Sequence, residues 1–396
     1  MYRVGVKKEI HMTWLYEKLI VLYMSLLILG NTFQFEPPYY IILVISILTV
    51  FFSSRRIERD YIKQYFFIFL FALYGIIIAI ITNGGIGAPI TIVTGLMVLY
   101  AARKIKFDKF DVTILVLAMI ISILYWLYRS PTYYDVFFYN HWKGDGTFTN
   151  SNGVGHYLAY EGAFLFIIMS LSNRKWLQIG KWMLAIGCIW GCYNVKSRMA
   201  LFTLLLFLIV NVIVKFRYKY RKTIVTFFLY FSVFFEIIFP VIYLLLYKIG
   251  FGLNIEFFGL AEKGLYSGRQ SIWRDTFETL HTIPEWLFGI GSKQNFWIDG
   301  LLNMHNNVMN LLVVMGIIGV IVYFSYLITY IKKNFDFNNC SFLQIQCMIF
   351  FICIIFEGTT DITLFYNSFL GYYFIPLGIA LNNNYSTINY SQKRNT

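Results

Sequence analysis

Apolar runs long enough to cross a lipid bilayer follow one another along this sequence. A membrane-spanning helix needs about 20 mostly apolar residues, within a range of about 17 to 25. By this criterion the sequence predicts about twelve spanning helices, with ends placed to within a few residues. They cover residues 19–35, 38–53, 65–82, 86–102, 112–128, 155–171, 177–194, 199–214, 223–247, 305–331, 342–356 and 362–381. The expected fold class is an all-α polytopic membrane protein, with residues 1–396 in a single integral membrane domain.

Composition agrees with this fold class. Hydrophobic residues make up 58% of the chain and charged residues only 13%, whereas soluble domains carry about 25% charged residues. The net charge of +13 would suggest a nucleic-acid partner in a soluble chain, but in a membrane protein basic residues mainly set orientation. No nucleic acid is therefore expected as a partner. The first apolar run begins near Leu19 without a cleavage motif after it, so we expect it to be retained.

Basic residues alternate between rich and poor loops along the chain. Loops rich in Lys and Arg stay in the cytoplasm, and one alternating set of loops holds 24 of the 33 basic residues. These are Arg3, Lys7, Lys8, Lys18, Arg55, Arg56, Arg59, Lys63, Arg103, Lys104, Lys106, Lys109, Arg174, Lys175, Lys181, Lys215, Arg217, Lys219, Arg221, Lys222, Lys332, Lys333, Lys393 and Arg394. This side is predicted to be cytoplasmic, with both termini inside.

Two segments on the opposite, outer side are longer than the other loops. They are a smaller extracytoplasmic segment at residues 129–155 and a large loop at residues 248–304, between the ninth and tenth predicted spans. Loops of this length usually serve a function or are disordered. The nine remaining basic residues are assigned to this side: Arg129, Lys143, Lys196, Arg198, Lys248, Lys263, Arg269, Arg274 and Lys293. Positive charge is normally avoided there, which suggests a function for some of them.

The large loop contains an expected amphipathic helix at residues 267–280. Apolar side chains recur there at helical spacing, at Ile272, Trp273, Phe277 and Leu280. Ser267 or Gly268 is expected near its start, and Pro284 is expected to stop it. An aromatic, amphipathic helix at this depth can rest at the membrane interface.

Lys196 and Arg198 lie in a short outer turn with the sequence NVKSRM. Two cations in such a turn oppose the orientation rule, and Arg198 stands at the start of a helix, whose dipole also favours an anion. A bound phosphate would satisfy both features. The alternative is that both side chains reach out to lipid phosphates.

Arg269 and Arg274 form a second pair, at the start of the loop helix. Five residues apart on a helix, they project about 140° from each other, so we do not expect them to bind the same oxygen. The alternative for this pair is a solvated helix face, with Asp275 and Glu278 as neighbours. Both arginines are candidate contacts for an anionic substrate.

His305 stands at the head of the tenth predicted span, in the sequence NMHNNVMNLLVVMGIIG. The helix dipole disfavours a protonated histidine at this position, so we expect His305 to be neutral near pH 7 and able to act as a general base. A polar histidine at the membrane interface is the alternative. Asn306, directly after it, is a candidate substrate contact.

A third outer cluster lies in residues 146–162, GTFTNSNGVGHYLAYEG. Asn150, Ser151 and Asn152 are typical helix caps, and Asn152 is also a candidate substrate contact. His156 and Glu161 follow within the next span. Ionisable groups at such depth are costly and often functional, although a buried hydrogen bond would also explain them.

Glu357 and Asp361, in a short outer turn, are candidate partners for the arginines or contacts for a sugar.

Several motifs of metal and nucleotide chemistry are missing from the sequence. It contains no GxxxxGK[ST] phosphate loop, no HExxH and no DxD, which disfavours a metal-dependent nucleotide-sugar transferase. Cys188 and Cys192 have the i, i+4 spacing of some metal ligands, but buried apolar cysteines are the preferred interpretation. No metal and no cofactor are expected, and the candidate chemistry rests on arginines.

Four of these motifs occur in an order that resembles the O-antigen ligase and polymerase superfamily of bacterial envelope glycosyltransferases. They are the SNG near Asn152, the KSRMAL that opens a span, GRQSIW with its helix, and IPEWLFGIG followed by HNNVMNLLVVMGIIG. The resemblance covers about residues 146–319, and the first five spans are similar in hydropathy only. One departure is that the usual Asn-Pro-Asn triplet reads Asn150, Ser151, Asn152 here.

The resemblance implies a site and a reaction. Arg198 matches the family's arginine at the top of a helix, Arg269 or Arg274 its loop arginine, and His305 the histidine proposed as base. The family transfers a glycan from a lipid diphosphate to an acceptor hydroxyl on the outer face of the membrane, without a metal. Expected partners are an undecaprenyl-diphosphate-linked oligosaccharide, membrane lipids, a flippase and a chain-length regulator.

A polymerase of O-antigen or capsular repeat units is the preferred function within this superfamily. A ligase that transfers the finished chain to lipid A core or to protein is the first alternative. A flippase or exporter of the lipid-linked glycan is the second, because many spans and basic residues also suit a transporter. Transporters often carry charges in the middle of several spans, whereas the charges here gather at one face.

Overall fold

The computed structural model describes residues 2–33, 59–142, 150–251, 268–291, 304–361, 364 and 367–385. These residues form helices and the segments that join them, and none of them forms a β-strand. The expected all-α fold class is confirmed for this part of the chain. The helices are α1 (Tyr2–Phe33), α3 (Arg59–Ile81), α4 (Gly87–Ala102), α5 (Lys109–Trp142), α6 (Ser151–Ser170), α7 (Lys175–Asn194), α8 (Arg198–Phe216), α9 (Arg221–Lys248), α10 (Arg269–Thr279), α11 (Ile283–Phe288), α12 (Asn307–Asn334), α13 (Phe342–Glu357) and α14 (Asn367–Ala380), with 3₁₀ turns at Tyr218–Tyr220 and Asn383–Tyr385.

Helices stand at all the predicted spans except 38–53, which lies outside the described residues. By length and composition, four segments of the described chain can cross a membrane: Lys109–Asp135, Arg198–Phe216, Tyr218–Lys248 and Asn307–Asn334. Five shorter apolar helices accompany them. These helices agree with a membrane protein, and the count of twelve spans stays a prediction.

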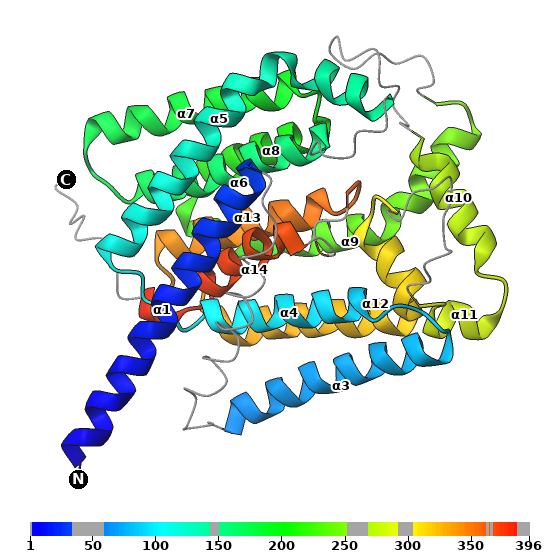
Figure 1. The fold of residues 1–396 in the computed structure, drawn as a ribbon, viewed down its shortest axis with the longest axis horizontal. Helices are drawn as coiled ribbons and strands as arrows, with labels where there is room; N and C mark the ends of the chain where they lie inside the picture. The colour runs from blue at the N-terminus through cyan, green and yellow to red at the C-terminus, as the bar shows by residue number, and fades with distance from the viewer. Residues whose placement is uncertain are drawn as a thin grey trace.

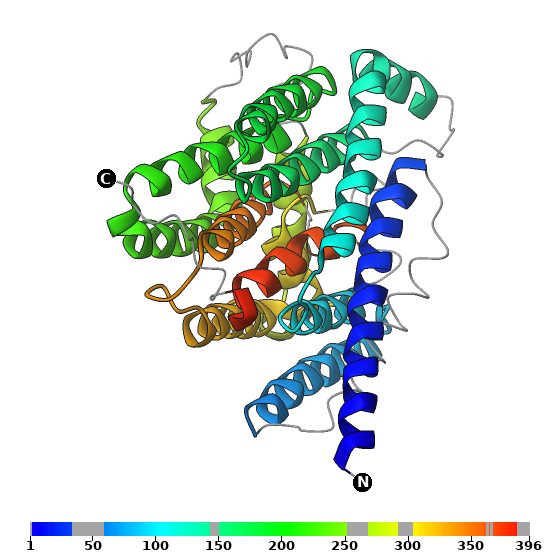
Figure 2. The ribbon, with the colours of Figure 1, turned by 90° about the vertical axis from the view of Figure 1, so that its left-hand side faces the viewer.

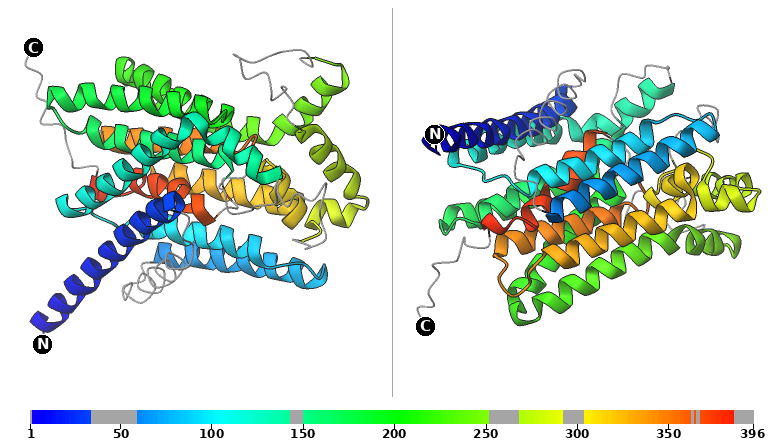
Figure 3. Two further views of the ribbon diagram at one scale, coloured as in Figure 1. Left: turned by 45° about the horizontal axis from the view of Figure 1, so that its top comes forward. Right: turned by 90° about the horizontal axis from the view of Figure 1, so that it is seen from below.

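Helix α13 lies at the centre of the bundle (Figure 1). Its residues from Leu343 to Glu357 are all buried, and it contacts α6, α8, α9 and α14. Helix α14 in turn packs on α4. Helices α3, α4 and α12 form one side of the bundle and α5 to α8 the other, which the two views of Figure 3 also show. Helix α1 runs along α5 (Figure 2).

Segments predicted on the same side of the membrane contact one another. At the predicted cytoplasmic end, Lys18 Nζ lies 2.8 Å from Asp108 Oδ2, and Asn382 Nδ2 donates to the carbonyl of Ile105 at 2.6 Å. At the other end, Asn306 Nδ2 donates to the carbonyl of Thr359 at 3.0 Å. In these contacts, the two ends of the helix bundle agree with the two sides predicted from the charges of the loops.

The predicted outer segment 129–155 begins as helix rather than as loop. Helix α5 continues through Pro131 to Trp142, well beyond the predicted end of its span at residue 128. Asn150 then caps α6, because its side chain accepts from the backbone N–H of Asn152 at 2.9 Å. The expected capping role of Asn150 is confirmed.

The amphipathic helix expected at residues 267–280 is α10, which begins after Gly268. Its buried face, with Ile272 and Trp273, packs against the protein, and its position relative to a membrane interface stays a prediction. Trp273 is fully buried; its ring lies 4.7 Å from that of Tyr243 in α9. Its Nε1 donates to the carbonyl of Met304 at 2.6 Å. Helix α10 is thereby fixed against α9 and the start of α12, as Figure 1 shows.

Pro284 does not stop α10, contrary to the expectation. Helix α10 already ends at Thr279, and Pro284 lies in the first turn of α11, where its missing N–H leaves no helical hydrogen bond unmade. Thr282 and Glu285 close a capping box around the start of α11. The proline therefore begins a second short helix.

Helix α12 is broken at Gly316, whose backbone has φ 69° and ψ −174°. The segment after α11 fits into this break. Ile290 N donates to the carbonyl of Val313 at 2.8 Å, and Tyr74 Oη donates to the carbonyl of Met315 at 2.7 Å. Carbonyls that the break leaves without helical partners are satisfied in this way.

Gly316→Ala should lower the free energy of unfolding by about 1–3 kcal/mol, since a positive φ and a steric clash both oppose a Cβ there. An added Cβ would stand 2.2 Å from the carbonyl oxygen of Leu287. The measurement is thermal unfolding of the purified protein in detergent. Gly87→Ala is the control, because a Cβ at Gly87 meets no atom within 4 Å. Equal unfolding midpoints for the two variants would contradict this account of the break.

Candidate functional site

The start of α6 and the turn between α7 and α8 are in direct contact. A Cβ on Gly155 would stand 2.2 Å from the Cβ of Ser197, so only glycine allows this approach. Ser197 Oγ donates to the carbonyl of Asn152 at 3.4 Å. The SNG and KSR motifs, which are separated in sequence, are neighbours in space. Asn152 is half-buried beside the turn that carries Lys196 and Arg198.

Three of the predicted cations gather at this end of the bundle. Lys196 Nζ stands 3.9 Å from the ring centroid of Tyr134, and its backbone has a φ of 54°. Arg198, the first residue of α8, is close enough to Arg269, the first residue of α10, for their charges to repel. Arg269 Nε is buried without a hydrogen-bond partner among the described residues. An anion between the two guanidinium groups would relieve both the repulsion and the missing hydrogen bond.

Arg274 differs from Arg269 in its surroundings. Its side chain is 62% exposed, with Nε 3.3 Å from Asp275 Oδ1 and 3.9 Å from Glu278 Oε1. These are the acidic neighbours expected for a solvated helix face. The role of Arg274 in binding substrate stays a prediction. Arg269, unlike Arg274, has a charge interaction with Arg198.

His305 precedes α12 in a left-handed backbone conformation, with φ 48°. Non-glycine residues rarely adopt it, and such strain concentrates at functional sites. The two asparagines that follow His305 form hydrogen bonds through their side chains. The Asn306 side chain accepts from Met309 N at 2.7 Å and caps α12, and Asn307 Nδ2 donates to Glu236 Oε1 at 2.9 Å. Asn306 is fully buried, so the structure gives it a positioning role; a contact with substrate stays a prediction.

A largely buried chain of acids and histidines connects α6, the turn after α13 and the residue before the Asn306 cap of α12. His156 Nδ1 pairs with Glu357 Oε1, and its Nε2 lies 2.9 Å from Asp361 Oδ2. The other oxygen of Asp361, Oδ1, lies 3.8 Å from His305 Nδ1. Asp361 thus stands between the two histidines, so a carboxylate is in place to orient the candidate base and to stabilise its protonated form.

Asp361 stays ionised in this arrangement. Burial alone would raise the pKa of its carboxyl, but hydrogen bonds and charge interactions with His156 and His305 outweigh burial and hold the pKa well below its usual range. Asp361 therefore presents a negative charge to both histidines throughout the physiological pH range.

Asp361→Asn should lower the free energy of unfolding at pH 7 by about 1.5–3 kcal/mol, the usual contribution of hydrogen bonds to a charged group. Because the pKa of Asp361 is lower in the folded than in the unfolded state, its stabilisation is complete above about pH 4 and is lost as pH falls toward the folded pKa. The difference from wild type should therefore shrink below about pH 4. Denaturation in detergent from pH 3 to pH 8 measures it.

Asp275→Asn is the matched control for this prediction, since Asp275 pairs with the exposed Arg274 at the surface. Its effect should stay below about 0.5 kcal/mol. If the difference in free energy of unfolding between Asp361→Asn and wild type grew at low pH, the assigned charge state of Asp361 would be contradicted.

Two further carboxylates are buried deeper in the bundle. Glu161 accepts from Tyr372 Oη at 2.7 Å, which agrees with the alternative of a buried hydrogen bond; a contact with substrate stays a prediction. Glu236 in α9 accepts a hydrogen bond from Asn307 Nδ2. It is not among the candidate residues named from the sequence. The available signal was a single acidic residue inside an apolar span.

Glu357 and Asp361 have other contacts than the sequence predicts. They were expected to pair with arginines or to bind a sugar, whereas the structure pairs them with His156 and His305. His156 was expected to contact substrate. In the structure it is buried between the two acids, and that expectation remains untested.

An apolar groove of about 430 Å³ runs beside this site, between α9 and α12 and under α10 and α11. Val308 and Met309 line it about one helical turn below His305. Phe277 and Trp286 line it from the loop helices, and Val241 and Ile321 lie 45% and 58% exposed on its helices. The groove can hold a hydrocarbon chain whose polar end lies at the site.

The described residues contain no group of three or more His, Cys, Asp or Glu side chains placed to hold a metal ion. The five cysteines are free and buried, as the preferred interpretation of Cys188 and Cys192 required. Comparison of the chain with protein-family models, curated proteins and solved structures finds no match.

Proposed function

We propose that this protein polymerises undecaprenyl-diphosphate-linked oligosaccharide repeat units into an O-antigen or capsular polysaccharide. The observation that carries the proposal is the charge repulsion between Arg198, at the start of α8, and Arg269, at the start of α10, at the end of the bundle where His305 precedes α12. Together they combine an anion site with a candidate base. The order of motifs in the sequence supports the same function.

The arginines bind the diphosphate of the donor. As the bond between the anomeric carbon and the phosphate oxygen breaks, its electron pair stays on the diphosphate, and negative charge accumulates there. Two guanidinium groups can neutralise that charge bidentately and without a metal. Arg269 Nε is buried and has no hydrogen-bond partner within the described part of the chain, so it is a donor available for a phosphate oxygen.

His305 takes the proton of the attacking sugar hydroxyl. The hydroxyl oxygen forms the new bond to the anomeric carbon as the diphosphate leaves from the opposite side, so configuration inverts at this carbon. Asp361, 3.8 Å from His305 Nδ1, stabilises the imidazolium that results. A covalent glycosyl-enzyme adduct or a product with retained configuration would rule out this single displacement.

The apolar groove beside His305 suits the polyprenyl chain of the donor. A polyprenyl chain in this groove would lie along α9 and α12. The proposal includes about twelve spans in the bacterial cytoplasmic membrane, cytoplasmic termini and a site on the outer face. Sugar specificity is assigned to the segments 129–155 and 248–304, and the proposed partners are a flippase and a chain-length regulator.

The decisive test uses purified protein with synthetic undecaprenyl-diphosphate repeat units and no added metal. Polymerisation gives a ladder of products, each longer by one repeat unit, visible by gel electrophoresis and mass spectrometry. Transfer only to a lipid A core or protein acceptor would instead identify a ligase. Movement of a labelled lipid-linked glycan across proteoliposomes without new glycosidic bonds would identify a flippase. Either of these outcomes refutes the polymerase.

A further inference from the structure

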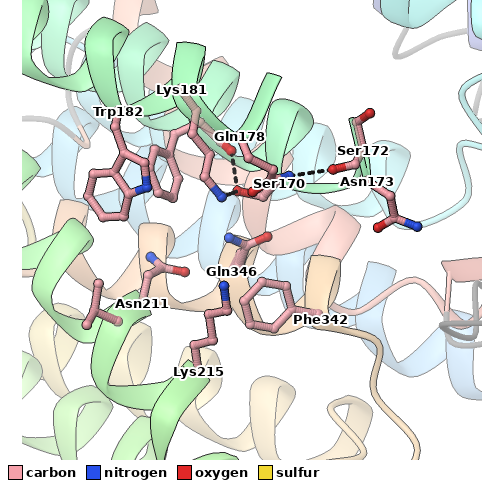
Figure 4. A pocket seen from close by; sticks show the side chains of 12 residues that line it. Ser170, Ser172, Asn173, Gln178, Lys181, Trp182, Asn211, Lys215, Phe342 and Gln346 are labelled. Carbon is pink, nitrogen blue, oxygen red and sulfur yellow. Dashed lines mark hydrogen bonds between the residues drawn. The ribbon is translucent and has the colours of Figure 1, made fainter. Parts of the chain in front are cut away.

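A polar cavity of about 480 Å³ lies at the opposite end of α6, α7 and α8 from the site described above. It is enclosed by the end of α6, the start of α7, the end of α8 and the start of α13 (Figure 4). Helix α6 has 20 residues between Ser151 and Ser170, and such a helix spans about 30 Å. The cavity is thus separate from His305 and its arginines, and it lies at the end predicted to be cytoplasmic.

Two lysines face this cavity. Lys181 is buried, with 7% of its surface exposed; its Nζ donates to Ser170 Oγ at 3.1 Å. Lys215 on α8 also lines the cavity and is close enough to repel the charge of Lys181. Neither forms an ion pair with a carboxylate of the described part of the chain. An anion between them would offset both the burial and the repulsion.

Two buried amides complete the cavity. Asn211 is 4% exposed and Gln346 is 1% exposed. The oxygens Asn211 Oδ1 and Gln346 Oε1 have no hydrogen-bond partner among the described residues. Figure 4 shows both side chains, from α8 and α13, in the space between the two lysines. Buried acceptors normally have donors, and a ligand with hydroxyl groups would supply them.

We propose that this cavity binds a phosphate ester whose alcohol part carries free hydroxyl groups. The ammonium groups of Lys181 and Lys215 bind the phosphate, and the amides of Asn211 and Gln346 accept from the hydroxyls. Glycerol phosphate has this chemistry, either as the headgroup of phosphatidylglycerol in the cytoplasmic leaflet or as a soluble ester. Trp182 lines the cavity and is 41% exposed, and exposed tryptophans favour headgroup depth.

Native mass spectrometry of the full chain tests the proposal by titration with phosphatidylglycerol and with phosphatidylcholine of the same acyl chains. In a parallel arm, thermal unfolding is measured with glycerol 1-phosphate and with inorganic phosphate. We expect one phosphatidylglycerol to be retained in preference to phosphatidylcholine. In Lys181→Gln/Lys215→Gln this binding should weaken about tenfold or more, because both charges that attract the phosphate are lost.

Lys175→Gln is the matched control, because Lys175 is exposed at the start of α7 and does not line the cavity. Its affinity should equal that of wild type. Gln346→Leu, which keeps both lysines, should reduce the preference for glycerol phosphate over inorganic phosphate. Stabilisation by glycerol 1-phosphate without a lipid preference would identify the soluble ester as the ligand. Equal binding of both lipids with no effect of either phosphate, or unchanged binding in the double variant, would overturn the proposal.

Discussion

His305→Ala should lower the rate of glycosidic bond formation by about 10²–10⁴-fold, the usual contribution of a general base. The rate falls because the variant lacks the proposed acceptor for the proton of the attacking hydroxyl. Asp361 lies within hydrogen-bond distance of His156 Nε2 and stays ionised, but a carboxylate of lowered pKa is a poor base near neutral pH. The initial rate of ladder growth from synthetic lipid-linked repeat units measures the effect.

His281→Ala is the matched control for this substitution. His281 lies in the predicted outer loop 248–304, between α10 and α11, and is exposed. It should retain activity within about twofold of wild type. The unfolding midpoint of His305→Ala should be compared with wild type, so that lost activity is not confused with lost fold. A folded His305→Ala protein with the wild-type rate would exclude His305 as the base.

Arg198→Ala and Arg269→Ala should each lower the rate by about 10²–10³-fold, as expected for removal of a group that stabilises developing charge in the transition state. The two arginines are the cations whose charges interact across α8 and α10. Lysine at either position keeps the charge but not the bidentate geometry, so activity should recover only in part. The same ladder assay, at donor concentrations above and below KM, separates effects on kcat from effects on KM.

Arg274→Ala tests whether position in the fold, rather than charge alone, decides the function of these arginines. Arg274 is on the same helix as Arg269, but it is exposed and paired with Asp275. It should stay within about threefold of wild type, the range expected for a surface charge. If Arg274→Ala lost as much activity as Arg269→Ala, the assignment of the loop arginine would be wrong.

Much of the architecture could be predicted from the sequence. Apolar runs identified the described helices of the bundle, and the capping residues and helical spacing identified α6 and α10. Two boundaries were wrong for a physical reason. Helix α5 continues past its apolar run to Trp142, and Pro284 begins a helix instead of ending one, because residue preferences do not specify where a chain leaves the bundle.

The candidate site was predicted only as a set of separate residues. Arg269 and Arg274 could be placed on different faces of one helix, but which face is buried depends on Trp273 packing against Tyr243 of another helix. The contact between His156 and Asp361 joins residues 205 positions apart. No local pattern predicts such a pair, and for that reason both acids were assigned other partners.

The sequence by itself determined the fold class, the two sides of the predicted bundle and the types of residue available for chemistry. These follow from the transfer of each segment into lipid and from loop charge, which are properties of residues taken one stretch at a time. Only the tertiary structure decided which groups lie near one another: Arg198 within range of the charge of Arg269, Asp361 between two histidines, and Ile290 at the break at Gly316. Such contacts depend on how helices distant in sequence pack together, and that is set by the shapes of both surfaces at once.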